Sequence, residues 1–296
     1  MTVRSTSGRT PPDRVITSVA DRRNTILEVI RNARRAIALS LFRCNDPQIF
    51  SELGQAAARG VQVDALITSR AKGDKSELKE LWTALERTGA SVHAYTDPVV
   101  KYHAKYLVAD DGPAVVASFN FTRKCFERTC DALVLTHDPE VVEGLRALMA
   151  ADRDRRPLPA TVSPRLIIGP ERARQQFTAL IEQAHSSLRL IDPKLSDPDL
   201  VTLLNARHGA GLTVEVFGSK RLGNLKSHGK ILLIDDRIAV VGGLALAAIS
   251  LDFRREVAIV VEDPVAVAEV KELFQTIDAM PTAGRPRTPD ARGLTL

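Results

Sequence analysis

Two stretches of this 296-residue chain carry the same reactive side chains at the same spacing. The repeated residues are His103, Lys105 and Asp110 in the first stretch and His228, Lys230 and Asp235 in the second. Each residue of the second set follows its counterpart by 125 positions (228 − 103, 230 − 105 and 235 − 110). An acid lies 28 positions after each histidine, Asp131 in one case and Glu256 in the other (131 − 103 and 256 − 228). This repeat predicts two half-sites that meet at a pseudo-twofold axis.

Histidine and lysine at this spacing suit attack on a phosphodiester. Such a group carries a negative charge, which repels a nucleophile unless cations neutralise it. Lys105 and Lys230 would supply that charge, and alternation along a strand would place each on the same face as its histidine. Histidine can act as nucleophile and as general acid, because its reference pKa is near 6.5. Two histidines could therefore divide these roles, provided that one is neutral while the other is protonated.

The residues that follow the first motif could add hydrogen bonds to a phosphate. Ser118 and Asn120 lie two positions apart after an apolar run. The repeat places Gly243 and Ala245 at the corresponding positions of the second half (243 − 118 and 245 − 120). We therefore expect the first half to make more of the hydrogen bonds to the phosphoryl oxygens.

The remaining motif residues favour structure over metal chemistry. Asp110 and Asp235 each end a predicted strand just before an acidic or glycine residue of a turn, so we expect them to brace the motif. No carboxylate-rich set of ligands accompanies the histidines, and the lysine beside each would repel a divalent cation. We expect neither a metal site nor a cofactor.

Taken with their surroundings, the motifs resemble a known family. HAKYLVAD followed by ASFN, and HGKILLID followed by GG, resemble the paired His-x-Lys-x4-Asp motifs of the phospholipase D superfamily, and the resemblance extends over about residues 20–280. Ala117 replaces the usual glycine of the first motif. Gly243 stands where the family usually has serine, and Ala245 where it usually has asparagine. We interpret the second copy as a weakened half-site.

The resemblance implies a fold and roles for the residues. It implies two similar lobes with one active site at their interface, and chemistry that needs no metal. It also implies a crossed arrangement, in which Glu256 supports His103 and Asp131 supports His228. His103 would be the nucleophile and His228 the general acid, since the first motif commonly supplies the nucleophile in tandem members.

Composition restricts the partners and the compartment. The chain has 41 basic and 36 acidic side chains, giving a net charge of +5, which favours anionic partners. Its three cysteines, Cys44, Cys125 and Cys130, form no metal or disulfide pattern and suit a reducing compartment. No apolar run approaches the ~18 residues of a membrane span. We expect a cytoplasmic monomer that touches membranes at most peripherally.

Strand and helix patterns alternate in both halves, which predicts an α/β fold with helices outside a mixed sheet in each lobe. The predicted boundaries are 14–150 for the first lobe, 151–165 for a charged, proline-rich linker, 166–280 for the second lobe and 281–296 for a disordered tail. Tyr102–Ala109 is expected as one strand carrying the first motif. Asp21–Ala36 is expected as an amphipathic helix with Arg22 away from its apolar face.

The two lobes differ by one insertion. Asp46–Pro47 and Asp197–Pro198 each predict a helix start, and they lie 151 positions apart (197 − 46). Gly60 and Gly211 are also 151 positions apart (211 − 60), so the first half holds 26 additional residues (151 − 125) between Gly60 and His103. They include a further predicted helix, Lys75–Thr88.

Three functions are compatible with these patterns. The leading interpretation is a phosphodiesterase or phosphatidyltransferase that acts on anionic phospholipids through a covalent phosphohistidine, similar to phospholipase D and cardiolipin synthase-like proteins. A nuclease of the same superfamily is the alternative, because basic residues near both motifs would suit a nucleic-acid backbone. They are Arg123, Lys124 and Arg128, then Lys220, Arg221 and Lys226, then Arg254 and Arg255. A phosphate-binding module without catalysis is the third, favoured by Gly243 and Ala245.

Overall fold

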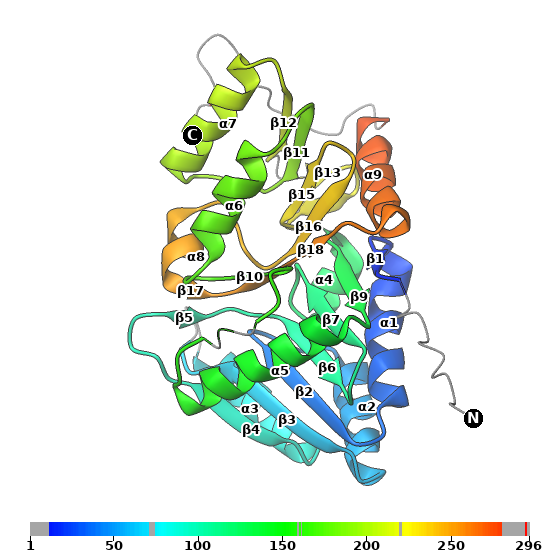
Figure 1. Ribbon diagram of the computed structural model, residues 1–296. Coiled ribbons are helices and arrows are strands. Elements are labelled where there is room, and N and C mark those ends of the chain that lie inside the picture. The colour runs from blue at the N-terminus through cyan, green and yellow to red at the C-terminus, as the bar shows by residue number, and fades with distance from the viewer. Residues whose placement is uncertain are drawn as a thin grey trace, which may run out of the picture.

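Two mixed sheets flanked by helices make up the protein, as the computed structural model shows (Figure 1). It describes residues 12–70, 75–158, 160, 162–218, 221–279 and 294. The predicted α/β fold is confirmed. Apart from Leu294, the predicted tail lies outside the described residues. Among the residues described, no helix has the length and apolar character needed to span a bilayer.

The elements follow one another in the same order in both halves. The helices are α1 (Val19–Asn32), α2 (Pro47–Ala58), α3 (Lys75–Arg87), α4 (Arg123–Arg128), α5 (Pro139–Asp154), α6 (Ala173–Glu182), α7 (Pro198–Gly209), α8 (Ala248–Phe253) and α9 (Pro264–Asp278). The strands of the first half are β1 (Arg14–Ile16), β2 (Ala36–Leu41), β3 (Gln62–Thr68), β4 (Ser91–Tyr95), β5 (Lys101–Tyr102), β6 (Tyr106–Ala109), β7 (Ala114–Ala117), β8 (Thr129–Cys130) and β9 (Leu133–Thr136). Those of the second half are β10 (Leu166–Ile168), β11 (Ser187–Ile191), β12 (Thr213–Phe217), β13 (Arg221–Leu222), β14 (Leu225–Ser227), β15 (Ile231–Ile234), β16 (Ile238–Gly242), β17 (Arg254–Arg255) and β18 (Val257–Val261).

The two large sheets have matching topologies. The first has the order β1-β9-β7-β6-β2-β3-β4, and the second the order β10-β18-β16-β15-β11-β12. In both sheets, the two strands joined by α2 or α7 are parallel, β2 with β3 and β11 with β12. From β2 to the edge strand β1, and from β11 to the edge strand β10, all neighbouring strands are antiparallel. Only the first sheet continues, with β4 paired parallel to β3. The insertion predicted from the repeat is therefore α3 together with β4.

Aspartate followed by proline starts the main helix of each layer. Asp46 and Asp197 cap α2 and α7, and each side chain accepts a hydrogen bond from a backbone N–H of the first turn. Asp138 and Asp263 do the same for α5 and α9. Proline at the next position loses no helical hydrogen bond, because that N–H would be unpaired in any helix start.

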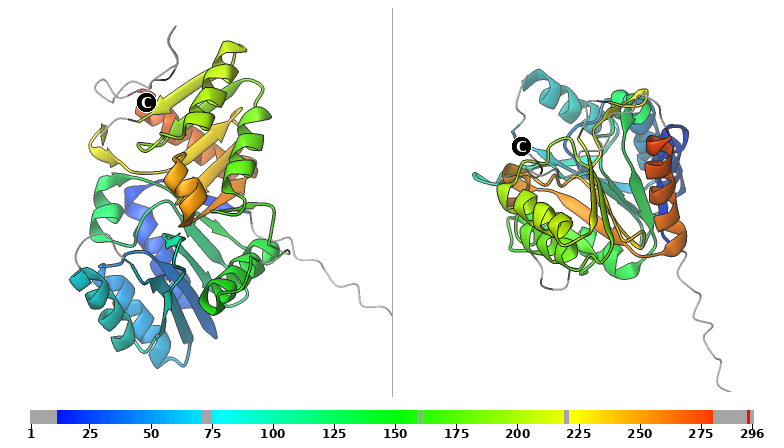
Figure 2. Two further views of the ribbon diagram at one scale, coloured as in Figure 1. Left: turned by 90° about the vertical axis from the view of Figure 1, so that its left-hand side faces the viewer. Right: turned by 90° about the horizontal axis from the view of Figure 1, so that it is seen from above.

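Three apolar cores hold the layers together. One lies between the first sheet and α1 to α4, and one between the second sheet and α6 to α8. The third contains the opposite faces of both sheets, together with α5 and α9. Along β7, Val115 points into the first core and Val116 into the shared one, as strand alternation requires. Because one core is common to both halves, packing fixes their relative position. Figure 2 shows the ribbons of the two halves stacked against each other in its left-hand view.

The sequence predictions differ from the structure at several places. Helix α1 ends at Asn32, and Ala36, the last residue of the predicted helix, begins β2. Helix α5 runs through Asp154, so it takes the first four residues of the predicted linker. The expected strand Tyr102–Ala109 is broken at residues 103–105, between β5 and β6. Arg22 is fully buried, and its guanidinium donates to the carbonyl of Thr129, 2.9 Å away, and lies over the Phe119 ring. A long arginine side chain can enter a core when its charged end finds carbonyl and aromatic partners.

Candidate active site

Two short parallel strand pairs join the halves beside the motifs. Strand β5 pairs with β17, aligning Lys101 with Arg254, and β14 pairs with β8, aligning Lys226 with Thr129. The two pairs are related by the same 125-residue offset as the motifs (226 − 101 and 254 − 129). In each pair, one strand leads into a histidine and the other into an acid of the opposite half. This crossing brings together residues that lie far apart in sequence.

The first cluster combines His103 with residues of the second half. Nδ1 of His103 is in hydrogen-bond contact with Glu256, and the other carboxylate oxygen of Glu256 accepts a hydrogen bond from Ser250. The Lys105 ammonium donates to the backbone carbonyl of His103 and lies 3.0 Å from its Nδ1. Because a carboxylate accepts the hydrogen bond at Nδ1, the proton of a neutral imidazole lies there and Nε2 keeps its lone pair.

Burial and charge set the protonation of this cluster. Burial, aided by the Lys105 ammonium, lowers the pKa of His103. Burial alone would raise the pKa of Glu256, but contact with His103 and Lys105 holds it below its ordinary value. Glu256 is thus an anion and His103 a neutral imidazole near pH 7. A neutral imidazole is the form that can act as a nucleophile.

The second cluster mirrors the first. Both carboxylate oxygens of Asp131 lie 3.0 Å from Nδ1 of His228, and Ser118 donates to Asp131 at 2.7 Å. The Lys230 ammonium donates to the carbonyl of His228 at 2.7 Å. Burial, opposed by the Asp131 charge, lowers the pKa of His228. The acid–histidine pairs are those that the family resemblance implied.

Ser250 is a site residue that the repeat did not reveal. Its hydroxyl donates to Glu256 and accepts from the backbone N–H of Ala245 at 3.0 Å. In the first half, Ser118 donates to Asp131 and accepts from the N–H of Ala132 at 3.1 Å. The two serines therefore make equivalent bonds, although the repeat aligns Ser118 with Gly243. The 125-residue offset leads from Ser118 to Gly243 and not to Ser250, because Ser250 lies further along the chain, in α8.

Ser118 and Asn120 have different surroundings, and those of Ser118 change the role expected for it. Ser118 is 0% exposed and its hydroxyl is engaged by Asp131, so in this structure it supports the acid and presents no surface to a substrate. Asn120 is half-buried, and its side-chain oxygen has no hydrogen-bond partner among the described residues. An unpaired buried oxygen is costly, and a ligand that donates a hydrogen bond could satisfy it.

Phe42 and Lys194 are further neighbours of the motifs that the sequence did not single out. The Phe42 ring lies 4.3 Å from the His103 ring, centroid to centroid, at an interplanar angle of 57°. Lys194 follows β11, and its backbone N–H donates to the buried Asp192 at 2.8 Å. Partial burial, together with the charges of Lys230 and Arg254, lowers the pKa of Lys194. Phe42 comes directly after β2, and Lys194 lies three residues after the end of β11.

Several cations crowd the site. Lys105 is 3% exposed; burial, with Lys230, Lys194 and Arg254 nearby, lowers its pKa to about 7. Among the described residues, no carboxylate lies within 4.0 Å of the Lys105 or Lys230 ammonium group in an ion pair. Buried ammonium groups without carboxylate partners stabilise a bound anion, and they lower the stability of the fold when no anion is bound.

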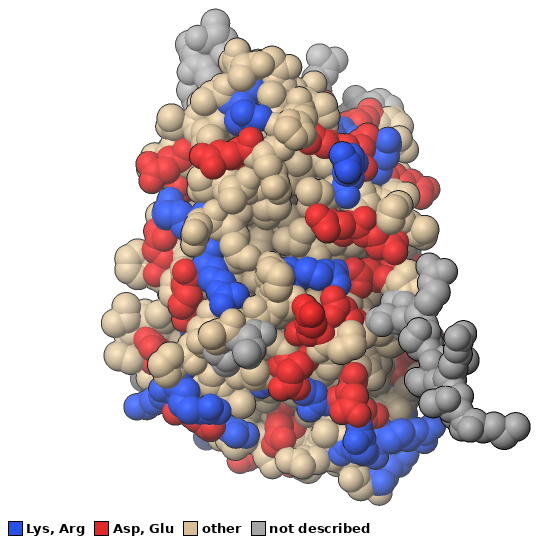
Figure 3. Space-filling model, viewed as in Figure 1, with Lys and Arg blue, Asp and Glu red and all other residues tan. Residues whose placement is uncertain are grey.

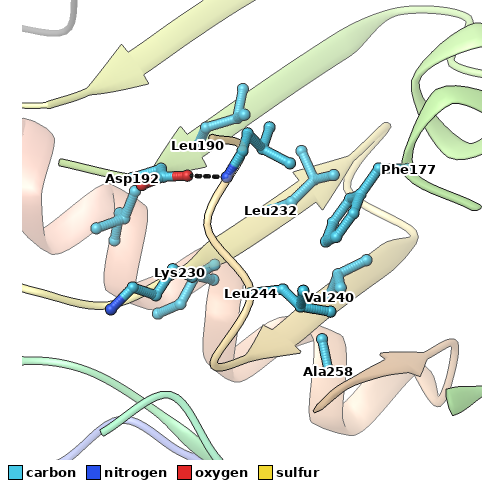
Figure 4. Close-up of a pocket in the computed structure, with 11 residues that line it drawn as sticks. Phe177, Leu190, Asp192, Lys230, Leu232, Val240, Leu244 and Ala258 are labelled. Carbon is cyan, nitrogen blue, oxygen red and sulfur yellow. Dashed lines mark hydrogen bonds between the residues drawn. The ribbon is translucent and has the colours of Figure 1, made fainter. Parts of the chain in front are cut away.

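The surroundings of Lys230 are apolar. The Asp192 carboxylate accepts a hydrogen bond from the backbone N–H of Leu246 at 2.7 Å (Figure 4). Asp192 follows β11 and Lys230 precedes the neighbouring strand β15, so both lie at the same end of this strand pair. Phe177, Leu232, Val240 and Ala258 line the other side of this small cavity. The ammonium group of Lys230 points away from them, toward the interface of the halves.

Asp110 and Asp235 brace the turns after β6 and β15. Asp110 accepts from the three successive backbone N–H groups that lead into β2, at 2.7–2.9 Å, and Asp235 accepts from the three that lead into β11, at 2.7–2.8 Å. Both residues have positive φ angles, 45° and 53°. These contacts match a structural role.

The basic residues near the motifs are not all available to a substrate. Arg255 is 6% exposed and forms ion pairs with Glu171, at 2.5 and 2.7 Å, and with Asp152, at 2.8 Å. It therefore joins α5 to the second half and is not a surface cation, contrary to the sequence interpretation. Arg123, Lys124 and Arg128 are exposed on or beside α4, whereas Lys220 lies outside the described residues. The face in Figure 3 carries acidic and basic side chains interspersed.

Grouped metal-binding side chains are not found in the part of the chain that the structure describes: no set of three or more histidine, cysteine, aspartate or glutamate residues could hold an ion there. The three cysteines are buried and free. Burial raises the pKa of the Cys44 and Cys130 thiols to about 12. Thiolate chemistry is disfavoured at those two positions.

Comparison with known proteins identifies relatives of the first half. A family described as "Cardiolipin synthase, PLD-like domain" matches residues 26–153. Phospholipase D of Rickettsia bellii is 29% identical over 137 residues, which cover 46% of this chain and 62% of that protein. Cardiolipin synthase 1 of Bacillus anthracis is 26% identical over 127 residues, covering 42% of this chain and 25% of that protein. The matches thus span less than two thirds of either relative.

Solved structures share the fold over nearly the whole chain. Polyphosphate kinase from Porphyromonas gingivalis is similar with a TM-score of 0.71 and 20% identity, covering 90% of this chain and 50% of that one. Phosphatidylserine synthase of Haemophilus influenzae is similar with a TM-score of 0.69 and 14% identity, covering 93% of this chain and 87% of that one. Residues 26–153 are thus similar in sequence to a PLD-like domain, and nearly the whole chain shares the fold of these two solved structures.

Proposed function

We propose that the protein is a phosphodiesterase or phosphatidyltransferase that acts on phospholipids through a covalent phosphohistidine. The observation that carries this proposal is the crossed support of the two histidines. Each Nδ1 contacts an acid of the opposite half, Glu256 for His103 and Asp131 for His228, which leaves both Nε2 atoms for chemistry. An acid at the second nitrogen orients an imidazole and stabilises the charge that develops on it.

The reaction would proceed in two displacements. In the first, Nε2 of His103 attacks phosphorus, the bond from phosphorus to the leaving oxygen breaks, and His228 donates its proton to that oxygen. In the second, His228 takes a proton from water or an alcohol, whose oxygen attacks phosphorus as the bond to His103 breaks. The products are the two cleaved parts of the diester, or a new diester when the acceptor is an alcohol.

Substrate binding would prepare the charges for this sequence. The pKa of His228 is lowered in the free protein, yet this residue must carry a proton to act as the acid. A bound phosphate anion favours the protonated imidazole, so binding would raise that pKa. Lys105 and Lys230 would neutralise the phosphoryl charge, and the side-chain NH2 group of Asn120 would donate a further hydrogen bond. We assign Ser118, with Ser250, to positioning the acids.

Two other functions remain as outcomes of the test. The exposed cations Arg123, Lys124 and Arg128 favour a nuclease, because they lie on the segment that leads to Asp131. A non-catalytic phosphate-binding module is supported by the loss of Asn120's counterpart at Ala245. Against it, Ser250 restores the hydroxyl contact that Gly243 lacks. The names of the two sequence relatives favour a phospholipid substrate.

An activity panel in excess chelator tests the proposal. The substrates are a labelled anionic phospholipid in vesicles, single- and double-stranded DNA, and bis(p-nitrophenyl) phosphate. We expect turnover of the lipid and of the chromogenic diester, with no loss caused by the chelator. Cleavage of DNA without cleavage of lipid would establish the nuclease instead. If activity is lost in chelator and restored by magnesium or zinc, the two-histidine mechanism is wrong.

A further inference from the structure

An open pocket lies beside the His103 cluster, in the first half. Its volume is about 400 Å³, and it lies between the end of β2, helix α2 and the inserted helix α3. Phe42, Phe50, Leu78 and Leu81 supply much of its apolar wall, and Ala84 lies at its α3 side. This volume falls within the range of small-molecule sites. The described part of the second half has no helix that corresponds to α3.

The pocket shares one wall, the Phe42 ring, with the candidate active site. Phe42 lines it and is also the ring that contacts the His103 imidazole, at 4.3 Å between centroids. Thr122, two residues after Asn120, lies on the same wall. A phosphate held at His103 and Asn120 would therefore have one substituent able to pass Phe42 and enter the pocket.

The charge of the rim discriminates among substituents. Glu77 is paired with Arg43 at 2.8 Å, so these two charges cancel. Glu80 also lines the pocket, is exposed, and has no ion-pair partner among the described residues. At the Phe42 side, the Lys101 and Lys105 ammonium groups each lie 5.6 Å from the ring centroid. At the exposed α3 side, the Glu80 carboxylate disfavours an anionic substituent such as the next phosphate of a polynucleotide. An uncharged hydrocarbon meets no such penalty and gains from the apolar wall.

We propose that the α3 pocket binds an uncharged alkyl arm of the substrate, the arm that stays on phosphorus in the covalent intermediate. This inference rests on the proposed function and adds the substituent class to it. In an in-line displacement, the leaving oxygen lies on the side of phosphorus opposite the attacking nitrogen. If His103 attacks, the departing alcohol moves away from His103, and the retained arm is the one that can lie against Phe42.

A homologous series of chromogenic diesters measures this binding. The probes are p-nitrophenyl phosphates whose second ester arm is methyl, butyl or octyl, used below their micellar concentrations. A fourth probe, thymidine 5′-(p-nitrophenyl) phosphate, carries a nucleoside arm. In each, p-nitrophenol is the leaving group and the second arm is retained. We expect kcat/KM to rise about two- to fourfold for each methylene added from methyl to butyl, and more slowly thereafter as the pocket fills.

Substitutions on α3 link the effect to the pocket. Ala84→Trp fills the pocket, and Ala84→Leu fills less of it, which guards against a folding defect in the larger variant. Both should lower the octyl-to-methyl ratio of kcat/KM, by about tenfold or more for tryptophan. Glu86→Trp places the same side chain on an exposed position of α3 outside the pocket and should leave the ratio unchanged.

The outcomes separate this inference from the proposed function. If the unaltered protein hydrolyses none of the four probes, the proposed function fails. If it hydrolyses them with no dependence on chain length, or if the dependence survives both Ala84 substitutions, the pocket does not hold the arm. Preference for the thymidine probe over the octyl probe would also overturn the inference, since it would show that a nucleoside arm is accepted in place of the alkyl chain.

Discussion

In the first half, the hydroxyl that supports the acid comes from Ser118, 13 residues before Asp131 and directly after β7. In the second half, it comes from Ser250, six residues before Glu256 and within α8. Each hydroxyl donates to a carboxylate and accepts a backbone N–H. The same local chemistry is thus reached from two different positions of the repeated unit. A missing motif residue therefore does not by itself mean a missing contact.

The difference between Asn120 and Ala245, unlike that between Ser118 and Gly243, is not compensated by a side chain from another position. The side-chain oxygen of Asn120 has no partner among the described residues, whereas Ala245 at the corresponding position has no polar side chain and is 2% exposed. On the acid side, the two halves are equivalent, and on the phosphate side, they differ. Under the proposed mechanism, both histidines would act in the reaction, while only the first half would bind the phosphate through an amide.

The largest effects should come from the histidines themselves. With a diester that has a good leaving group, His228→Asn should still form a phosphoryl adduct, which then persists because no base activates the acceptor. His103→Asn should form none, a loss on the order of 10⁴-fold or more in turnover. Mass spectrometry of acid-labile, peptide-mapped adducts locates the phosphoryl group. An adduct on His228 in the unaltered protein would reverse the two roles and keep the mechanism.

Loss of the amide should have the next largest effect. Asn120→Ala removes a hydrogen bond that acts on transition-state charge, a loss of roughly 2.7–4 kcal/mol in the best-studied case, so kcat should fall about a hundredfold or more. Ala245→Gly is the matched change in the second half and should alter kcat less than about threefold. Steady-state kinetics on the chromogenic diester measures both. Small, equal effects would mean that the asymmetry has no role in binding the phosphate.

The two serines allow a test of the equivalence. Removing either hydroxyl takes a hydrogen bond from a buried carboxylate, which costs on the order of 1–3 kcal/mol, or about tenfold in rate. Ser250→Ala should slow formation of the phosphohistidine, because it disturbs Glu256 and His103. Ser118→Ala should slow its breakdown, because it disturbs Asp131 and His228. Rapid-quench measurement resolves the two steps, and a silent Ser250→Ala would show that the halves are not equivalent.

The smallest effect concerns stability. Lys105 has a folded-state pKa of about 7, below its ordinary 10.5. Between these pH values the unfolded chain binds the proton and the folded chain does not, so stability rises with pH across that window. Below pH 7, the buried charge destabilises the fold. Lys105→Met should therefore raise the free energy of unfolding by ~1–3 kcal/mol at pH 6 and by less at pH 9.

Denaturant titrations at the two pH values measure this stability, although activity should be lost. Lys79→Met on α3 removes an exposed lysine instead, and its effect should stay within about 0.5 kcal/mol at both pH values. If Lys105→Met is destabilising at pH 6, the ammonium group is better compensated in the free protein than its surroundings indicate.

Periodicity and the repeat were enough to predict the fold class, the insertion of α3 and most helix starts. Strong signals marked these features, such as aspartate–proline pairs and alternating apolar residues. The junction could not be predicted, because β5, β8 and β17 are two residues long and β14 is three, too short for any periodic pattern. Their pairing depends on contacts between the halves, which local sequence does not encode.

The sequence also did not identify some individual side chains of the site, because their positions depend on contacts with distant segments. Phe42 reads as an ordinary apolar residue at a strand end, and only the tertiary structure places it against His103. Helix periodicity places Arg22 on the polar side of its helix, yet it is buried because α4 and β8 supply carbonyl oxygens and Phe119, after β7, supplies an aromatic ring. Burial of a charge depends on partners from distant segments, so helix periodicity alone could not predict it.

The crossed strand pairs β5–β17 and β14–β8 also bear on how the two halves can evolve. In a dimer of identical chains with this arrangement, any substitution would appear on both sides of the twofold axis at once. Here the halves are parts of one polypeptide, so each can change alone while the partner keeps the junction intact. Asn120 opposite Ala245, and the α3 insertion on one side only, are differences that a symmetric dimer could not carry. Fusion into a single chain thus permits specialisation of the two sides of one reaction centre.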